Sequence, residues 1–280
     1  MTIPIIILII LSFLALLLIF VRMGVDVKLP DYARSAAKEC ECGGSMTIGS
    51  REVQEDNFGV SETRHGVMAV LADGMGKHYG GKIASRIAVE SFQELFQGYD
   101  AFHNPQYYFR KAFQTANKKI LSQLDEGRGA ASVAAVMIHE RKMYYALAGD
   151  VKIAVYRKGD LVPVSSGHTI DKLAQEKFKE GKLTRQDAVA LLEHHRLYNY
   201  VGQDGFRDIE FFDKPITLYG GEIVALMSDG LYDGVSWRSM EECLAQEGSC
   251  KEKALELVEF INRKQDDNKD NASVILLRVL

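Results

Sequence analysis

Two short runs of the same shape carry the residues best suited to chemistry. Residues 70–76 and 225–231 each place an Asp-Gly pair at the end of an apolar run, at Asp73 and Asp229. An apolar run of this length that stops at glycine predicts an interior strand that delivers its carboxylate to a sheet edge. Asp56, Asp150 and Asp270 stand in comparable settings. Carboxylates gathered at one edge repel each other unless a cation lies between them, and oxygen ligands select hard ions such as Mg²⁺ or Mn²⁺. The pattern therefore predicts a metal-centred enzyme.

The elements that must position these acids follow from hydrophobic periodicity. Strands are predicted at 67–71, 132–138, 142–147, 153–156, 222–227 and 272–280. Helices are predicted at 81–96, from Asn104-Pro105 to about 124, at 171–178 and 185–192, and over 241–264 with an interruption near Gly248. The short gap at Glu140-Arg141 indicates a hairpin. Because the helices lie between groups of strands, antiparallel sheets covered by helices are favoured over a doubly wound parallel sheet.

The first residues of the chain predict a membrane anchor. Residues 3–21 carry no charge, and a helix of about 20 apolar residues rises roughly 30 Å, enough to cross the hydrocarbon core. A cleaved signal peptide fits poorly, because there is no basic segment before the run and no small-x-small cleavage site after it. Arg22, Lys28, Arg34 and Lys38 follow the run, so the positive-inside rule places the rest of the chain in the cytosol. We expect a single-pass membrane protein with an anchor at 1–22, a juxtamembrane linker at 23–45 and one catalytic domain at 46–280.

Composition excludes other classes of protein. A net charge of −4 among 280 residues gives no basic footprint for nucleic acid. A cytosolic domain of this size does not favour a disulfide framework, so we expect the four cysteines to be free thiols. Cys40-Glu41-Cys42 could alternatively bind a metal ion or carry an acyl chain near the membrane.

Several motifs are near misses for other chemistry. Residues 76–82 fit the start of a phosphate-binding loop, but Ile83 stands where a Ser or Thr must bind Mg²⁺, so a P-loop nucleotide hydrolase is only a remote alternative. Residues 266–271 imitate a calcium loop without its glycine or its bidentate glutamate. No cysteine is followed six residues later by arginine, which excludes the cysteine-dependent phosphatases. Arg51, five residues before Asp56, could hold a phosphate or form a surface ion pair.

Taken in order, the motifs resemble the metal-dependent Ser/Thr protein phosphatase family (PPM, or PP2C-like), in its bacterial branch. The matching segments are 49–57, 72–76, 84–85, 149–150, 181–184, 228–231 and 270–271, and they span the chain from about 47 to 280. The resemblance implies an α+β fold, an αββα sandwich of two antiparallel sheets flanked by helices, here preceded by one transmembrane helix. It also implies a binuclear Mn²⁺ or Mg²⁺ centre at one sandwich edge.

The resemblance assigns a role to each acid. The implied metal ligands are Glu55 through water, Asp56, Asp73 bridging both ions, Gly74 through its carbonyl, Asp229 and Asp270, with Asp150 at a possible third ion. Arg51 would hold the substrate phosphate. In the implied reaction, a water activated by two cations about 4 Å apart attacks phosphorus in line, and no phosphoenzyme forms. The implied partners are proteins phosphorylated on Ser or Thr, including substrates of a Ser/Thr kinase.

Four departures from the family pattern accompany these matches. Residues 129–131 read Gly-Ala-Ala instead of Gly-Thr-Thr, 151–152 read Val-Lys instead of Ser-Arg, and 167–168 read Gly-His instead of Asp-His. Met75 stands where some relatives carry a histidine that is a candidate general acid. Leaving-group protonation is therefore unassigned, with metal-bound water as the default and His78 as a substitute. A catalytically silent phosphoprotein-binding scaffold is the alternative function, but it would require lost metal ligands, and none is lost. Residues 165–205 match the family's variable flap.

Overall fold

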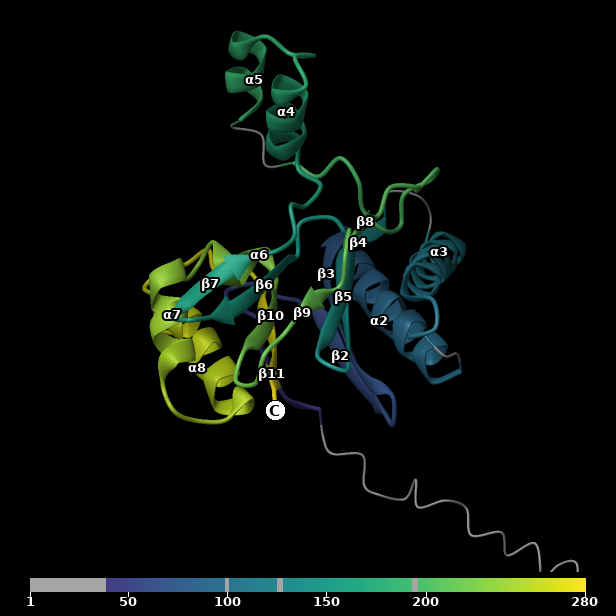
Figure 1. The fold of residues 1–280 in the computed structure, drawn as a ribbon. Helices are drawn as coiled ribbons and strands as arrows, with labels where there is room; N and C mark the ends of the chain where they lie inside the picture. The colour runs from purple at the N-terminus through teal and green to yellow at the C-terminus, as the bar shows by residue number, and fades with distance from the viewer. Residues whose placement is uncertain (1–38, 99–100, 125–127, 193–195) are drawn as a thin grey trace, which may run out of the picture. The chain divides into compact units, whose positions relative to one another are not determined.

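Two antiparallel β-sheets lie at the centre of the structure, a computed structural model that describes residues 39–98, 101–124, 128–192 and 196–280 (Figure 1). The first sheet has the strand order β1 (Cys40–Thr47), β11 (Ala272–Val279), β10 (Ile223–Met227), β6 (Lys152–Arg157) and β7 (Asp160–Pro163). The second has the order β2 (Asn57–Thr63), β3 (Gly66–Gly76), β4 (Gly129–His139), β5 (Lys142–Ala148) and β8 (Glu210–Phe211), and β9 (Ile216–Thr217) also pairs with β5. Every strand pair is antiparallel, as the sequence predicts.

Helices cover the outer faces of both sheets. The second sheet is covered by α2 (Gly80–Gly98), with α3 (Pro105–Gln123) beside it. The first sheet is covered by α7 (Trp237–Ala245) and α8 (Cys250–Asn262), and the short α6 (Asp229–Tyr232) follows β10. A hairpin of α4 (Ile170–Lys179) and α5 (Arg185–Leu191) projects from these layers (Figure 1). The layers confirm the expected αββα sandwich.

The central strands are apolar throughout because both of their faces are buried. In β10, Val224 and Leu226 join the core shared with the second sheet, whereas Ala225 and Met227 pack under α7 and α8. The strand β11 alternates between the same two cores. Burying each large apolar side chain contributes about 1.5–3 kcal/mol, so a Leu226→Ala change is expected to cost about 2–5 kcal/mol.

Two predicted helix boundaries are confirmed at the level of their caps. Asn104 precedes α3, and its side chain accepts a hydrogen bond from the backbone N–H of Tyr107 at 3.1 Å, with Pro105 in the first turn. The helical segment 241–264 is divided, as expected, between α7 and α8. Ser249 and Glu252 form a capping box that begins α8 just after Gly248.

The expected linker at 23–45 is too long, because residues 40–45 belong to β1. This strand pairs with β11 from Cys40–Val279 to Thr47–Ala272. The strand could not be predicted from the sequence because it contains Gly43 and Gly44, and glycine is a poor strand former. Gly43 is needed because a Cβ at this position would meet the backbone of Cys250, at the start of α8, at 2.3 Å. The strand β2 and the short strands β7, β8 and β9 were also not predicted.

The predicted anchor at 3–21 lies outside the described residues. In the part of the chain that the structure describes, no helix has the length and apolar character needed to cross a membrane. Cys243 and Cys250 are free thiols, as expected, and both are buried, as is Cys40.

Candidate active site

One edge of the sandwich collects the predicted acids because antiparallel strands bring chain-distant ends together. Asp73 lies near the end of β3, and the neighbouring β2 begins directly after Asp56. Asp229 follows β10, and Asp270 precedes β11, the strand paired with β10. Asp150 lies between β5 and β6. Strand ends and strand starts therefore meet at one place.

The strand β3 does not stop at its Asp-Gly pair, contrary to the prediction. Pairing with β4 continues through Asp73–Ser132 and Gly74–Ala131 to Gly76–Gly129. Gly74 is required by close packing, since a Cβ there would meet the carbonyl oxygens of Gly81 at 2.2 Å and of Glu55 at 2.5 Å. The glycine thus permits a tight approach between the strand, the start of α2 and the Glu55 backbone, and it does not end the strand.

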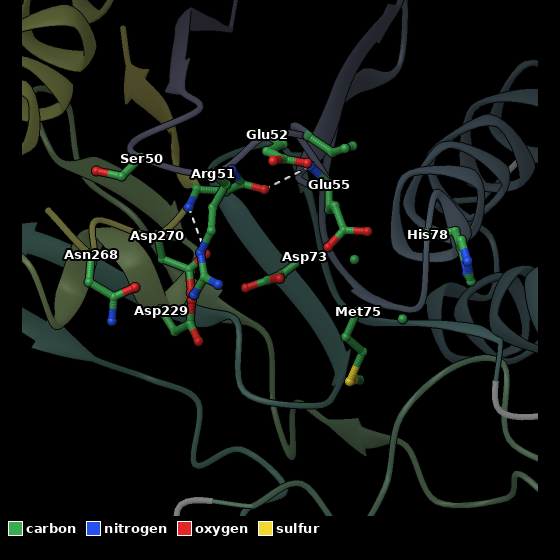
Figure 2. A pocket seen from close by; sticks show the side chains of 14 residues that line it. Ser50, Arg51, Glu52, Glu55, Asp73, Met75, His78, Asp229, Asn268 and Asp270 are labelled. Atoms are coloured by element: carbon green, nitrogen blue, oxygen red, sulfur yellow. Dashed lines mark hydrogen bonds and ion pairs between the residues drawn. The ribbon is translucent and has the colours of Figure 1, made fainter.

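A cavity of about 590 Å³ lies at this edge, and most of the predicted site residues line it. Those that do are Arg51, Glu55, Asp73, Gly74, Asp229 and Asp270. Figure 2 shows Asp73 in the middle, with Arg51, Asp229 and Asp270 on one side and Glu55 on the other. Asp56 is not among the lining residues and is only 5% exposed. Asp150 lines an adjoining cavity of about 290 Å³, which Asp229 also lines.

A serine that sequence reasoning left without a role fixes Asp56. The Ser228 hydroxyl donates to Asp56 Oδ2 at 2.9 Å and accepts the backbone N–H of Ser273 at 2.9 Å. Ser228 is fully buried, so this small network ties the end of β10 and the start of β11 to the acid. The signal was present as the serine directly before Asp229-Gly230, but its partner lies 172 positions away in sequence.

Two other polar side chains hold the backbone around the site. Asn271 accepts the N–H of Glu55 at 2.7 Å and donates to the carbonyl of Ile48 at 2.9 Å, which fixes the segment between β1 and β2. The Ser132 hydroxyl accepts the N–H of Asp150 at 2.7 Å. These residues orient the acids without lying between them, and no sequence pattern indicated their roles.

Arg51 forms an ion pair with one of the acids. Its Nη2 lies 2.7 Å from Asp270 Oδ2, and the two side chains are 49% and 45% exposed. The sequence left two roles open for Arg51, phosphate binding and a surface ion pair. The structure shows an ion pair, and it lies at the cavity instead of on a remote surface. An exposed ion pair contributes about 0–1 kcal/mol, so Arg51 can exchange this partner for another anion at little cost.

Burial, and after it the charges of neighbouring acids, raises the pKa values of Asp56, Asp73 and Asp229. Burial, followed by the charges of Asp56, Asp229 and Asp150, raises the pKa of Asp73 well above its ordinary value. Burial is also the main cause that raises the pKa of Asp56 to about 6 and of Asp229 to about 6, with further contributions from nearby acids. The site therefore favours an added positive charge.

The donor set fits a hard divalent cation. The side-chain donors around Asp73 are carboxylate oxygens, the ligands that Mg²⁺ and Mn²⁺ prefer. Glu55 Oε1 is buried without a hydrogen-bond partner, and burial raises the pKa of this carboxyl, a rise that the backbone N–H groups of Lys82 and Gly81 partly offset. Among the residues that the structure describes, no group of three or more His, Cys, Asp or Glu side chains is already arranged to hold a metal ion. The fit thus rests on donor chemistry, charge and the unpaired Glu55 oxygen.

The proteins and solved structures compared below with this chain are named phosphatases. The protein phosphatase 2C family model matches residues 43–261. The serine/threonine phosphatase stp of Listeria welshimeri is 28% identical over 236 residues, which cover 81% of this chain and 90% of that protein. The structure of the S. agalactiae serine/threonine phosphatase has a TM-score of 0.74 and 25% identity, covering 86% of this chain and 100% of that one. The catalytic domain of the phosphatase PstP, solved with two manganese ions, shares the fold at a TM-score of 0.68 and 22% identity, over 86% of this chain and 99% of its own. The chain therefore belongs to the protein phosphatase 2C family, and it is a serine/threonine phosphatase of the bacterial type.

Proposed function

We propose that this phosphatase is membrane-anchored and removes phosphate from Ser and Thr residues of proteins, including substrates of a Ser/Thr kinase. It uses Mn²⁺ or Mg²⁺, two ions at the main site and a third beside Asp150, and water as the nucleophile without a phosphoenzyme. The observation that carries the proposal is the cavity in which acids with raised pKa values surround Asp73. Neighbouring acids with no cation between them favour protonation, and divalent cations would satisfy them instead.

Each acid has a part in holding these ions. Asp73 is central in the cavity, and Asp56, Asp73, the Gly74 carbonyl, Asp229 and Asp270 would hold the two ions. Glu55 would act through a water, consistent with its unpaired buried oxygen. When bound, the two cations lower the pKa of a water between them and offset the charge of the phosphoryl oxygens.

Arg51 is the residue proposed to bind the substrate phosphate. Its guanidinium already binds a carboxylate oxygen at the cavity, that of Asp270. Both side chains of this ion pair are about half exposed, so the guanidinium can exchange Asp270 for a phosphate at little cost. A guanidinium binds phosphate through two parallel N–H bonds, so Arg51 would also orient the phosphoryl group.

The residue that protonates the leaving oxygen is the least defined part of the site. Met75 lines the cavity, and its thioether has no proton to donate. His78 lines the same cavity and is exposed, with a backbone φ of 60°. We keep water as the proton donor, with His78 as the side chain to test.

The anchor is proposed from the uncharged run at 3–21, with the described domain on the cytosolic side. Deletion of residues 1–38 should move the enzyme from the membrane fraction to the soluble fraction of a cell lysate. Equal recovery of the full and shortened chains in the soluble fraction would contradict the anchor.

The hydrolytic proposal is tested on the full chain in detergent. Phosphate release from phosphoserine and phosphothreonine peptides should require added Mn²⁺ or Mg²⁺ and stop with EDTA. A catalytically silent scaffold would bind the same peptides without releasing phosphate, and that result would overturn the proposal.

A further inference from the structure

A second cavity of about 520 Å³ adjoins the active-site cavity. Met75 and Gly76, at the end of β3, line both. The second cavity extends over Ala130 of β4 to the segment that contains Arg196 and Tyr200, and Lys77 completes the wall next to Gly76. A substrate whose phosphate enters the first cavity therefore has a second recess within reach along its chain.

The charges of the two cavities are opposite. Glu52, Glu55, Asp73, Asp229 and Asp270 line the first cavity. Among the described residues, no Asp or Glu lines the second, whereas Lys77 and Arg196 both do. Both cations are exposed, and neither side chain has an ion pair or hydrogen bond to any described residue. Two unpaired cations in one recess favour an anionic group.

The backbone that carries this recess is held in place. Met75 pairs with Ala130 and Gly76 with Gly129 at the ends of β3 and β4. Ala131 and Val201 exchange two backbone hydrogen bonds of 2.8 and 2.9 Å. Asn117 of α3 accepts the N–H of Gly202 at 2.6 Å. Hydrogen bonds thus hold the backbone at the ends of β3 and β4 and around Val201 and Gly202, on which part of the recess is built.

Part of the lining of the recess is apolar for a reason specific to this chain. Ala130 stands where the family pattern has Thr, and Met75, Leu197 and Tyr200 line the same recess. Apolar lining residues together with two cations suit the methylene stem of a side chain that ends in a negative charge. A free inorganic anion would gain nothing from those apolar residues.

We propose that this second cavity binds an anionic side chain of the substrate protein close in sequence to the phosphorylated Ser or Thr. Lys77 and Arg196 are the specificity-determining residues. The inference rests on the proposed protein phosphatase function and names its substrate class, phosphosites with an acidic residue or a second phosphoresidue nearby. Because the two cavities meet at Met75 and Gly76 and an extended peptide advances about 3.3 Å per residue, the anion should lie within a few residues of the phosphosite.

The test uses the full chain and matched phosphothreonine peptides. One set places Glu within three residues on either side of the phosphosite, a second replaces Glu with Gln, and a third carries a second phosphothreonine in place of Glu. We expect wild-type kcat/KM to be about fivefold or more higher for the Glu peptides than for the Gln peptides, as expected for one or two exposed ion pairs. The doubly phosphorylated set shows whether a phosphate is accepted as well as a carboxylate.

The double variant Lys77→Gln/Arg196→Gln should lose most of the Glu-over-Gln ratio. The variant Arg64→Gln/Lys118→Gln removes two exposed cations that line neither cavity and should keep the ratio. Equal wild-type kcat/KM for Glu and Gln peptides, or a ratio that survives in the Lys77/Arg196 variant, would overturn the inference.

Hydrolysis of p-nitrophenyl phosphate separates this inference from the proposed function. This ester has no flanking residues, so its turnover reports the acidic cavity alone. Turnover of the ester without a Glu-over-Gln ratio refutes only the anionic subsite. If neither the ester nor the peptides are hydrolysed, the proposed function fails. Fluorescence polarisation of the labelled Glu and Gln peptides still tests the anionic subsite in that case, because it measures their Kd values directly.

Discussion

The two neighbouring cavities share Met75 and Gly76 but have opposite chemistry. The first gathers carboxylates whose burial raises their pKa values, which leaves the folded protein with repulsion that an added cation relieves. The second holds two exposed cations beside apolar side chains and no acid among the described residues. The difference indicates a division of work, in which the first cavity carries out hydrolysis and the second selects among phosphosites. Changes in the first should alter turnover of every substrate, and changes in the second only the preference between substrates.

The largest effect is expected from Asp73→Asn, which keeps the shape of the central acid and removes its charge. Loss of a residue that merely orients a metal ligand costs about 10–100-fold, so loss of this shared ligand should lower kcat/KM at least about 100-fold. The fall should be equal for p-nitrophenyl phosphate and for both peptide sets. Asp267→Asn, an exposed acid that lines neither cavity, is the control. A fall confined to peptides would contradict the assignment of hydrolysis to the first cavity.

A smaller effect is expected from Ser228→Ala. It removes the donor to Asp56 Oδ2 and should weaken the apparent affinity for Mn²⁺ by about tenfold or more. A titration of activity against Mn²⁺ measures this shift, and the Glu-over-Gln ratio should stay unchanged. Ser236→Ala removes a helix cap of α7 instead and should leave the Mn²⁺ midpoint in place. Identical midpoints for both variants would show that Ser228 is only structural.

Arg51→Ala should act on phosphate binding more than on turnover. Loss of a charge-assisted contact to phosphate is expected to raise KM about tenfold, with a smaller change in kcat. Arg51→Lys keeps the positive charge but loses the planar guanidinium with its parallel N–H donors, so its KM should lie between those of the wild type and Arg51→Ala. Steady-state kinetics with p-nitrophenyl phosphate give both constants. An unchanged KM in Arg51→Ala would limit the residue to its ion pair with Asp270.

The smallest effect concerns stability and pH without metal. Asp229 and Asp56 have pKa values raised to about 6 from 3.8, so between pH 4 and 6 the folded state binds more protons than the unfolded one. Stability then falls as pH rises through that window. In EDTA, the Tm difference between pH 5 and pH 7 should be smaller in Asp229→Asn by about 3 °C. Mn²⁺ should raise the wild-type Tm more at pH 7 than at pH 5. The opposite order would contradict the electrostatic account of the first cavity.

Sequence patterns predicted the layers of the fold and the acids of the site, but not the strand β1 or the polar residues that hold the acids in place. The buried strands β10 and β11 were visible because both faces are apolar, whereas β1 was hidden by Gly43, which the approach of α8 requires. The acids could be grouped because their residue types are distinctive, and Glu55, Asp73, Asp229 and Asp270 do share one cavity, which Arg51 also lines. The roles of these four acids as metal ligands stay predictions.

Contacts between residues that are far apart in the chain could not be predicted from the sequence. The bond from Ser228 to Asp56 joins common residue types across 172 positions. Lys77 and Arg196 come together only because the ends of β3 and β4 meet the segment that follows α5. No spacing rule connects such pairs, since tertiary packing alone sets their distance.

The most direct test of the account is Mn²⁺ binding and turnover measured together on Asp229→Asn and on Asp267→Asn. Isothermal titration calorimetry gives the number of ions bound, and p-nitrophenyl phosphate hydrolysis gives the activity of the same samples. We predict that Asp229→Asn loses one ion and nearly all turnover, while Asp267→Asn behaves as the wild type. Full turnover in Asp229→Asn, or Mn²⁺ binding equal in both variants, would contradict the assignment of the acidic cavity as the catalytic metal site.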